Sequence, residues 1–254
     1  MADERWFSVE YLGALALVTY TRPPINMLSF RALGQLEELL RELAGREELS
    51  VVALTGGVPG YFAAHADVAD VMRMENGQPP EGDPDAWDRV NELLGSMPQL
   101  TVAAVNGQAW GGGCETALAC DLLVLSQGGH LRLLEVSKGV IPGAGGTQRL
   151  PRRIGVPRAL QMLLSGRVVR GEEALSWGLA DALLPEENFR EALLDWLAPI
   201  LAQPVHAARA AKEAVTRGSR LSLEEGLRLE KDLFARLVCC DATKALGEKT
   251  VETL

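Results

Sequence analysis

Three consecutive glycines, Gly111 to Gly113, constrain this chain more than any other stretch, because they separate a strand-like apolar run from a helix-like run. Glycine loses more backbone entropy on folding than any other residue, so three in a row indicate that something must approach the main chain closely. Glu115 follows almost at once, at the start of the helix-like run. Taken alone, the glycines are also compatible with unusual dihedral angles or with close helix–strand packing.

Short apolar runs alternate with helical patterns over the first half of the chain. The runs that predict strands lie at 13–22, 49–57, 100–107 and 122–126. The segments with helical spacing of apolar residues lie at 30–43, 85–96 and 114–121. Ser29 and Gly45 are suited to cap the first of these helices, and the Pro- and Gly-rich stretch 75–85 predicts a surface loop. The alternation predicts an α/β fold.

The end of the chain is different, because from about Glu191 onward helices follow one another with no strand between them. These helical segments lie at 189–203, 207–219 and 223–238. Ser222 and Glu225 have the spacing of a capping box for the last one. We therefore divide the chain into a core at 1–190 and a helical region at 191–254, which forms a second subdomain or an arm that packs on a neighbour.

Composition excludes several classes of protein. The 254 residues carry a formal net charge of -9, whereas sequence-independent nucleic-acid binding requires a basic face. The apolar runs are too short to cross a bilayer, and the first ten residues lack the apolar segment of a secretory signal. The cysteines show no CxxC pairing, which predicts free thiols at Cys114, Cys120, Cys239 and Cys240. We expect a protein of the cytoplasm or of a reducing organelle, with no nucleic-acid or membrane partner.

Common catalytic signatures are missing. The sequence contains no GxxxxGK[ST], no GxSxG and no HExxH, and "GAGGTQ" at 143–148 lacks the third glycine of a dinucleotide fingerprint. None of the three histidines lies at metal-ligand spacing from another, so no metal site is expected. Of these, His130 and His206 have no motif around them and are interpreted as structural or surface residues.

Two glycine- or alanine-rich turns remain, each after a predicted buried strand. The first is "YFAAHAD" at 61–67, and the second is "WGGGCE" at 110–115. If both turns face one cleft, their free N–H groups converge on a single oxygen, and the second set gains from the positive end of a helix. Such an arrangement is an oxyanion hole, which side chains larger than hydrogen would block.

Three segments in this order resemble the enoyl-CoA hydratase/isomerase family, also called the crotonase superfamily. They are "FAAHADVAD", "VAAVNGQAWGGGCETALACDLLV" and "LEVSKGVIPGAGGTQRLPRRIG", and the likeness extends from "RPPINMLS" to "KEAVTRGSRLSLEEGLRLEKDLF". The resemblance implies a spiral of repeated ββα units with a C-terminal α-helical trimerisation region. It also implies an acyl thioester of coenzyme A as substrate, a homotrimer or a hexamer of paired trimers, and no metal or redox cofactor.

The resemblance also assigns site residues. The oxyanion amides would be those of Ala66 and Gly112, and the backbone of Ala64 would contact the adenine. We extend the predicted substrate-binding set to the neighbours of these residues in the two turns, which are His65, Asp67 and Gly111. The two carboxyls of the family's hydratases correspond to Glu115 and Glu135.

These residue types suit the addition of water across an α,β-unsaturated thioester. Negative charge develops on the thioester oxygen, where two rigid N–H donors would stabilise it. We predict that Glu115 activates the water and that Glu135 gives a proton to the α-carbon. Two carboxyls in a closed apolar cleft should have raised pKa values. Without the resemblance, Glu115 would read as a first-turn helix acid and Glu135 as a solvated loop charge.

The chain departs from the family's pattern at three places. His65 replaces a glycine, either as a residue that tolerates positive φ, which we favour, or as a proton donor that shapes the mouth of the pocket. Arg132 and Leu134 stand where glycine and proline often precede the second glutamate, so the position of Glu135 can differ. The sequence ends at "GEKTVETL" without the basic tail of many relatives, so a lysine contact to CoA from a neighbour is in doubt.

The prediction is an enoyl-CoA hydratase that makes 3-hydroxyacyl-CoA in β-oxidation or a related pathway. The alternatives are an enoyl-CoA isomerase, another crotonase-type reaction, or a non-catalytic acyl-CoA-binding member of the family. An isomerase needs one base, so the presence of both glutamates favours hydration.

Overall fold

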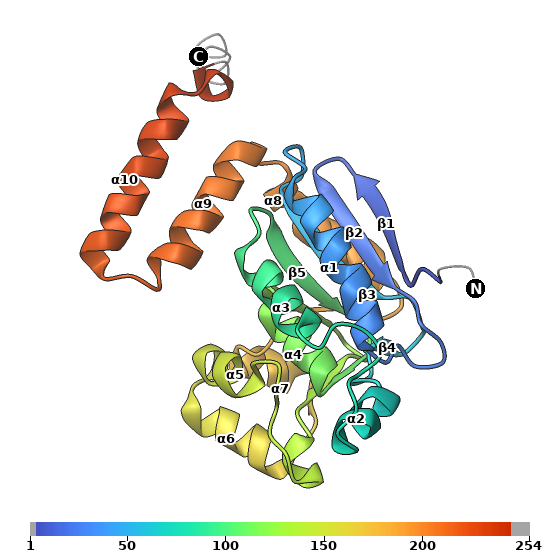
Figure 1. Ribbon diagram of the computed structural model, residues 1–254. Helices are drawn as coiled ribbons and strands as arrows, with labels where there is room; N and C mark the ends of the chain where they lie inside the picture. The colour runs from blue at the N-terminus through green and yellow to red at the C-terminus, as the bar shows by residue number, and fades with distance from the viewer. Residues whose placement is uncertain (1–3, 245–254) are drawn as a thin grey trace.

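The computed structural model describes residues 4–244, and its centre is a six-stranded sheet in the order β1-β2-β3-β5-β7-β10. All neighbouring strands in it are parallel except β1, which pairs antiparallel with β2. Its strands are β1 (Phe7–Leu12), β2 (Leu15–Tyr20), β3 (Val51–Gly56), β5 (Leu100–Val105), β7 (Leu122–Ser126) and β10 (Ala182–Leu184). The sheet forms the scaffold seen behind the helices in Figure 1.

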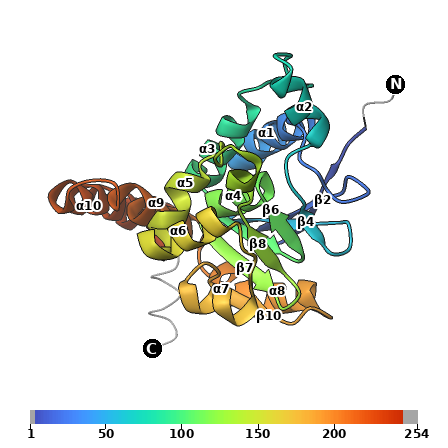
Figure 2. The ribbon, with the colours of Figure 1, turned by 90° about the horizontal axis from the view of Figure 1, so that it is seen from below.

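A second, smaller sheet lies beside the first, in the order β4-β6-β8-β9. Its strands have only two or three residues each: β4 (Tyr61–Ala63), β6 (Gln108–Trp110), β8 (His130–Arg132) and β9 (Val169–Arg170). Each of the first three follows a long strand by a short turn, so β3 leads to β4, β5 to β6 and β7 to β8. Figure 2 shows the small sheet next to β7 and β10.

A helical segment follows each strand pair and completes the repeated ββα unit, so the predicted crotonase-like spiral is confirmed. The helices of the core are α1 (Phe30–Ala44), α2 (Val68–Glu75), α3 (Ala86–Ser96), α4 (Gly112–Ala119), η1 (Glu135–Lys138, a 3₁₀ turn), α5 (Gly146–Ile154), α6 (Val156–Ser165) and α7 (Gly171–Trp177). Ser29 caps α1 by accepting from the Ala32 N–H, and the helix ends at Gly45 as predicted. The predicted loop at 75–85 connects α2 to α3.

Apolar side chains fill both faces of the large sheet. On one face, α1 and α3 pack with α4, whose every residue is buried, against strand residues such as Val18, Val52 and Leu123. On the other face, α8 (Phe189–Leu201) buries Phe189, Leu193 and Leu197. The predicted helical region thus contributes one helix to the core.

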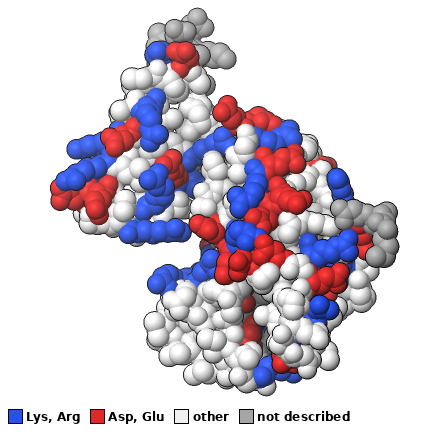
Figure 3. Space-filling model, viewed as in Figure 1, with Lys and Arg blue, Asp and Glu red and all other residues white. Residues whose placement is uncertain are grey.

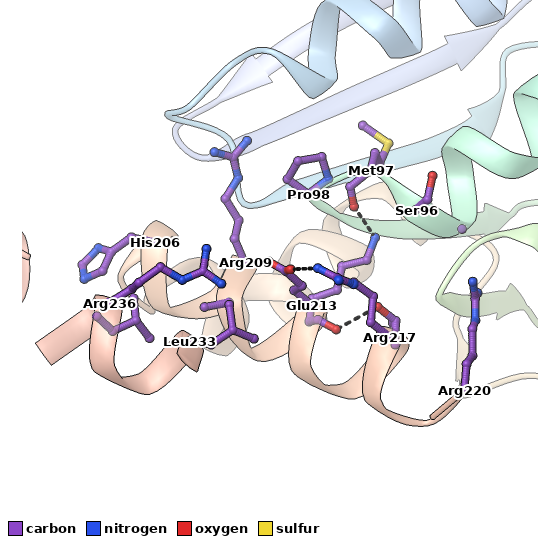
Figure 4. Close-up of a pocket in the computed structure, with 15 residues that line it drawn as sticks. Ser96, Met97, Pro98, His206, Arg209, Glu213, Arg217, Arg220, Leu233 and Arg236 are labelled. Carbon is purple, nitrogen blue, oxygen red and sulfur yellow. Dashed lines mark hydrogen bonds and ion pairs between the residues drawn. The ribbon is translucent and has the colours of Figure 1, made fainter. Parts of the chain in front are cut away.

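The last two helices of the described chain form a hairpin that stands away from this core (Figure 1). They are α9 (Val205–Gly218) and α10 (Leu223–Cys239), and the capping box of Ser222 and Glu225 is present at the start of α10. A groove of about 430 Å³ separates the hairpin from the segment 95–98, with arginines along its wall (Figure 4). The nearly buried Lys212 crosses at its base, where its ammonium lies 2.7 Å from the Asp121 carboxylate and donates to the Met97 and Gln99 carbonyls.

In Figure 3, charged side chains cover the upper right of the molecule, where the large sheet lies in Figure 1, whereas the region of α5 and α6 at the lower left is largely uncharged. Exposed apolar side chains of that region include Val156, Leu160 and Leu164. The four cysteines are free. Within residues 4–244, no helix is long and apolar enough to cross a bilayer, and no cluster of side chains is suited to bind a metal ion.

Candidate active site

The first turn, after β4, is held by a segment that lies some forty residues earlier in the chain. Asn26 is fully buried and donates from Nδ2 to the carbonyls of Tyr20, Tyr61 and Phe62. The Leu28 main chain then pairs with this turn: its N–H donates to the His65 carbonyl at 2.9 Å, and its carbonyl accepts from the Asp67 N–H at 2.8 Å. This backbone bridge fixes the peptide that carries the Ala66 N–H.

The second turn depends on glycines because two neighbours occupy the space that side chains would fill and because one position has a positive φ. A Cβ on Gly112 would overlap the ring of Trp87, and one on Gly113 would overlap the Ala63 carbonyl. Gly111 has a φ of +50° and donates its N–H to the Arg132 carbonyl. The run is therefore explained by close approach of the neighbours and by positive φ together.

The two turns lie side by side, because they follow the adjacent parallel strands β4 and β6. A Cβ on Gly111 would lie 3.8 Å from the His65 Cβ of the first turn and 3.0 Å from the Glu135 Oε1. Within the described residues, neither the Ala66 N–H nor the Gly112 N–H donates a hydrogen bond. The structure thus brings both turns and one predicted catalytic carboxyl to one place.

Glu115 lies in the first turn of α4 and is only 3% exposed. Its Oε1 accepts from the N–H groups of Ala144 and Gly146, each at 2.8 Å, so it also faces the start of α5. The pKa of this carboxyl is raised to about 7, mainly because the group is buried; the nearby charge of Glu135 adds to the rise, and the two amides and the charge of Arg149 oppose it. The side chain is therefore able to exchange a proton near neutral pH.

Glu135 begins the 3₁₀ turn η1, directly after β8. Its Oε2 is buried and has no hydrogen-bond partner within the described residues. Burial raises the pKa of this carboxyl as well, so the predicted rise holds for both glutamates. A buried carboxyl oxygen without a donor favours the protonated form or an incoming polar ligand.

His65 does not have the positive φ that would make it a substitute for glycine, since Asn26 is the one non-glycine with positive φ among the described residues. The interpretation of His65 as a conformational stand-in is therefore wrong. Its Nδ1 lies 2.7 Å from the Ala66 carbonyl, which can only accept, so Nδ1 carries the hydrogen. The residue is half-buried, and its Cβ lies next to Gly111.

The other predicted binding residues lie in this turn but already have partners. Ala64 donates its N–H to the Asn26 carbonyl, and its own carbonyl accepts from the Gln108 side chain at 3.4 Å. Asp67 caps α2 through the Ala69 N–H and forms an ion pair with Arg22 at 2.7 Å. Contacts of Ala64 and Asp67 with the substrate stay predictions.

Arg132 and His130, which lie in β8 before Glu135, both contact Trp110. Arg132 stacks on the Trp110 ring and donates to the Gly166 carbonyl at 2.6 Å. His130 accepts from the Trp110 indole at 2.8 Å, in agreement with the structural interpretation of this histidine. The expectation about a lysine contact to CoA concerns the last residues of the sequence, which lie outside the described residues.

Sequence reasoning missed several residues that support the site. Asn26 and Leu28 hold the first turn, and Trp87 packs against the second. Asn91 and Arg149 both donate to the carbonyl of Ala144, next to Glu115. The positive φ of Asn26 and the burial of Asn91 are the signals that only coordinates could supply.

The fold and the site define an α/β protein of the crotonase type, with one buried and one half-buried carboxyl beside two backbone turns. The sequence matches the model of the family described as enoyl-CoA hydratase/isomerase over residues 10–252. The Bacillus subtilis protein YngF is 35% identical over 239 residues, which cover 94% of this chain and 91% of YngF. The chain belongs to the enoyl-CoA hydratase/isomerase family.

Solved structures agree with this assignment. The enoyl-CoA hydratase of Bacillus anthracis superposes with a TM-score of 0.86 at 32% identity, over 96% of each chain. A structure from Thermobifida fusca in complex with acetoacetyl-CoA superposes with a TM-score of 0.81 at 27% identity, over 92% of this chain and 95% of that one.

Proposed function

We propose that the protein is an enoyl-CoA hydratase, which adds water across the trans-2 double bond of an enoyl-CoA to give the 3-hydroxyacyl-CoA. The observation that carries the proposal is a pair of carboxyls beside the turn of Gly111: Glu115, which is buried, and Glu135, which is half-buried with its Oε2 shielded from solvent. Both have raised pKa values. Relatives with the hydratase name and the acetoacetyl-CoA complex of a structural neighbour support an acyl-CoA substrate.

In the proposed mechanism, the free N–H groups of Ala66 and Gly112 bind the thioester oxygen and stabilise the charge that develops there. One preorganised donor of this kind typically contributes about 3–4 kcal/mol. The Leu28 bridge and the packing of Trp87 on Gly112 keep both amides rigid, so no reorganisation is needed during the reaction.

Glu115 is proposed as the base that activates water, because its pKa of about 7 gives it both ionised and protonated forms near neutral pH. Its Oε1 is bound by two amides, which leaves Oε2 for the water. Glu135 is proposed as the acid that gives the α-carbon its proton, since burial favours its protonated form. The substrate supplies CoA, and the mechanism requires neither a metal nor a redox cofactor.

The experiment is a turnover screen over enoyl-CoA and dienoyl-CoA thioesters. Hydration of crotonyl-CoA is measured as the loss of its absorbance. We expect hydration by the wild type and a loss of at least 100-fold in kcat for Glu115→Gln and Glu135→Gln, with acyl-CoA binding retained. Full hydratase activity in both variants would refute the mechanism. Migration of the double bond without a hydrated product would instead identify an isomerase, and binding without turnover an acyl-CoA-binding protein.

His65 keeps its second interpretation, a donor or a wall at the mouth of the site, now that the first is wrong. The residue is half-buried with its Cβ beside Gly111, which favours contact with the thioester end of a substrate. A His65→Gly enzyme should change kcat or its pH dependence on crotonyl-CoA, and an unchanged kcat across pH would exclude this function.

We also propose that the protein forms a homotrimer or a hexamer through its C-terminal hairpin. Large apolar side chains of α10 face solvent in the single chain, with Leu223 80% and Phe234 66% exposed. Burying such a row against another copy is the ordinary way to remove an apolar face from water. Light scattering should give three or six times the chain mass, and Phe234→Asp should lower it. A monomeric wild type would refute the proposal.

A further inference from the structure

We propose that Asn91 and Arg149 are positioning residues for Glu115: together they hold the Ala144 carbonyl so that the amides of residues 144 and 146 both point at one carboxylate oxygen. The inference deepens the proposed hydratase function and rests on it for the kinetic effect. The geometry itself comes from contacts among three helices, α3, α4 and α5.

The Ala144 carbonyl accepts two hydrogen bonds from side chains. Asn91 Nδ2 donates from α3 at 2.9 Å, and Arg149 Nη1 donates from α5 at 2.9 Å. The peptide groups on either side of this carbonyl then present the Ala144 and Gly146 N–H groups to Glu115 Oε1, each at 2.8 Å. Two side chains on one carbonyl thereby fix two amides on one carboxylate.

The glycines of this loop are required by the same arrangement. A Cβ on Gly145, which has a φ of +99°, would overlap the Arg149 guanidinium that crosses it. A Cβ on Gly146 would lie 3.1 Å from the Glu115 Oε1 and 2.9 Å from the Pro142 Cβ. The segment thus leaves room for the guanidinium on one face and for the carboxylate on the other.

Asn91 is only 2% exposed, and a residue that served only to fill this buried space would not need a polar amide. Its Oδ1 is buried without a partner within the described residues, so the side chain keeps an unfavourable orphan acceptor. A leucine of similar volume would avoid that penalty. The bond to Ala144 is the single described hydrogen bond of the Asn91 side chain, which is why we assign the residue a function at Glu115.

Arg149 adds a charge to this geometry. The half-buried guanidinium is an opposite charge near Glu115 and opposes the rise of its pKa. The other titratable groups that bear on the pair are Glu135 from η1, Cys114 beside Glu115, and Asp88, Cys120 and Arg220 around Arg149. Asn91 is neutral, so its replacement changes only the positioning of the two amides, whereas replacement of Arg149 also removes a charge.

The test compares Asn91→Leu, Arg149→Gln and Arg149→Lys. Arg152→Gln is the matched control, because Arg152 is exposed on the same helix and bonds only to Gln148. We expect Asn91→Leu to keep the melting temperature but lower kcat 10- to 100-fold with little change in KM, as misplacement of a base does. Arg149→Gln should lower kcat similarly and move the acid limb of kcat/KM to higher pH, since a cation is lost. Arg149→Lys should restore the limb in part.

A readout without turnover separates this inference from the proposed function. The ¹³C titration of the Glu115 carboxyl should shift to higher pH in Asn91→Leu, because the Ala144 and Gly146 amides that lower its pKa lose their support, and also in Arg149→Gln; it should stay in place in Arg152→Gln. If the wild type hydrates no substrate, the proposed function fails, and this titration still decides the positioning. Wild-type kcat and an unmoved titration in Asn91→Leu and Arg149→Gln would overturn the inference. If Asn91→Leu does not fold, the Arg149 variants decide.

Discussion

Replacing Glu115 by glutamine should stabilise the protein while it abolishes turnover, and the gain should depend on pH. In the folded chain this carboxyl has a pKa of about 7, mainly because it is buried, against an ordinary value of 4.5. The folded state therefore binds the proton more tightly, and the free energy of unfolding falls as pH rises between these two values. At 1.36 kcal/mol per pKa unit, the full penalty is about 3 kcal/mol above pH 8.

Glutamine removes this penalty but keeps an oxygen that can accept from the Ala144 and Gly146 N–H groups. Urea denaturation should show the variant more stable than the wild type by about 1 kcal/mol at pH 5.5 and about 3 kcal/mol at pH 8.5. Glu38→Gln, at an exposed position of α1, serves as the control and should show no such growth with pH. A gain of equal size at both pH values, or a loss at pH 8.5, would refute the reasoning.

Two further predictions concern stability. Lys212→Met leaves the Asp121 carboxylate, 11% exposed, without its ion-pair partner, so unfolding in urea should show a loss of about 3–5 kcal/mol; a loss below 1 kcal/mol would show that the pair does not anchor α9. Gly113→Ala should lower the free energy of unfolding by about 1–3 kcal/mol or more, because the new methyl overlaps the Ala63 carbonyl. Gly34→Ala, within α1 and with open space around it, should instead raise that free energy by about 0.5–1 kcal/mol, and equal effects of the two changes would contradict the packing argument.

The regular part of the fold could be predicted from the sequence because its signals are local. The helix from Phe30 shows its apolar spacing, its Ser29 cap and its closing Gly45 within seventeen residues, and the capping box of α10 is equally local. The strands of the small sheet were not predicted, since two or three residues are too few to show an alternation. The edge strand β1 was missed because half of its residues face solvent and it starts among charges.

The site was predicted from the resemblance as a set of residues, but its supports were not. The bonds from Ala144 and Gly146 to Glu115 join residues about thirty positions apart, and the bond from Asn91 to Ala144 spans 53 positions. No periodicity in the sequence records such contacts. His65 was misinterpreted for the same reason, because the backbone angle at a single turn residue is set by the segment that pairs with it.

The backbone bridge at Leu28 has a consequence for how the protein loses activity. One of the two amides proposed to bind the substrate oxygen is held in place by Leu28, in the segment that connects β2 to α1. Detachment of β1 and β2 would free that amide even while the other four strands of the large sheet and the C-terminal hairpin stay folded. Mild heat or low denaturant should then inactivate the protein before its helices melt. Activity would report on the attachment of β1 and β2, and circular dichroism on the helices.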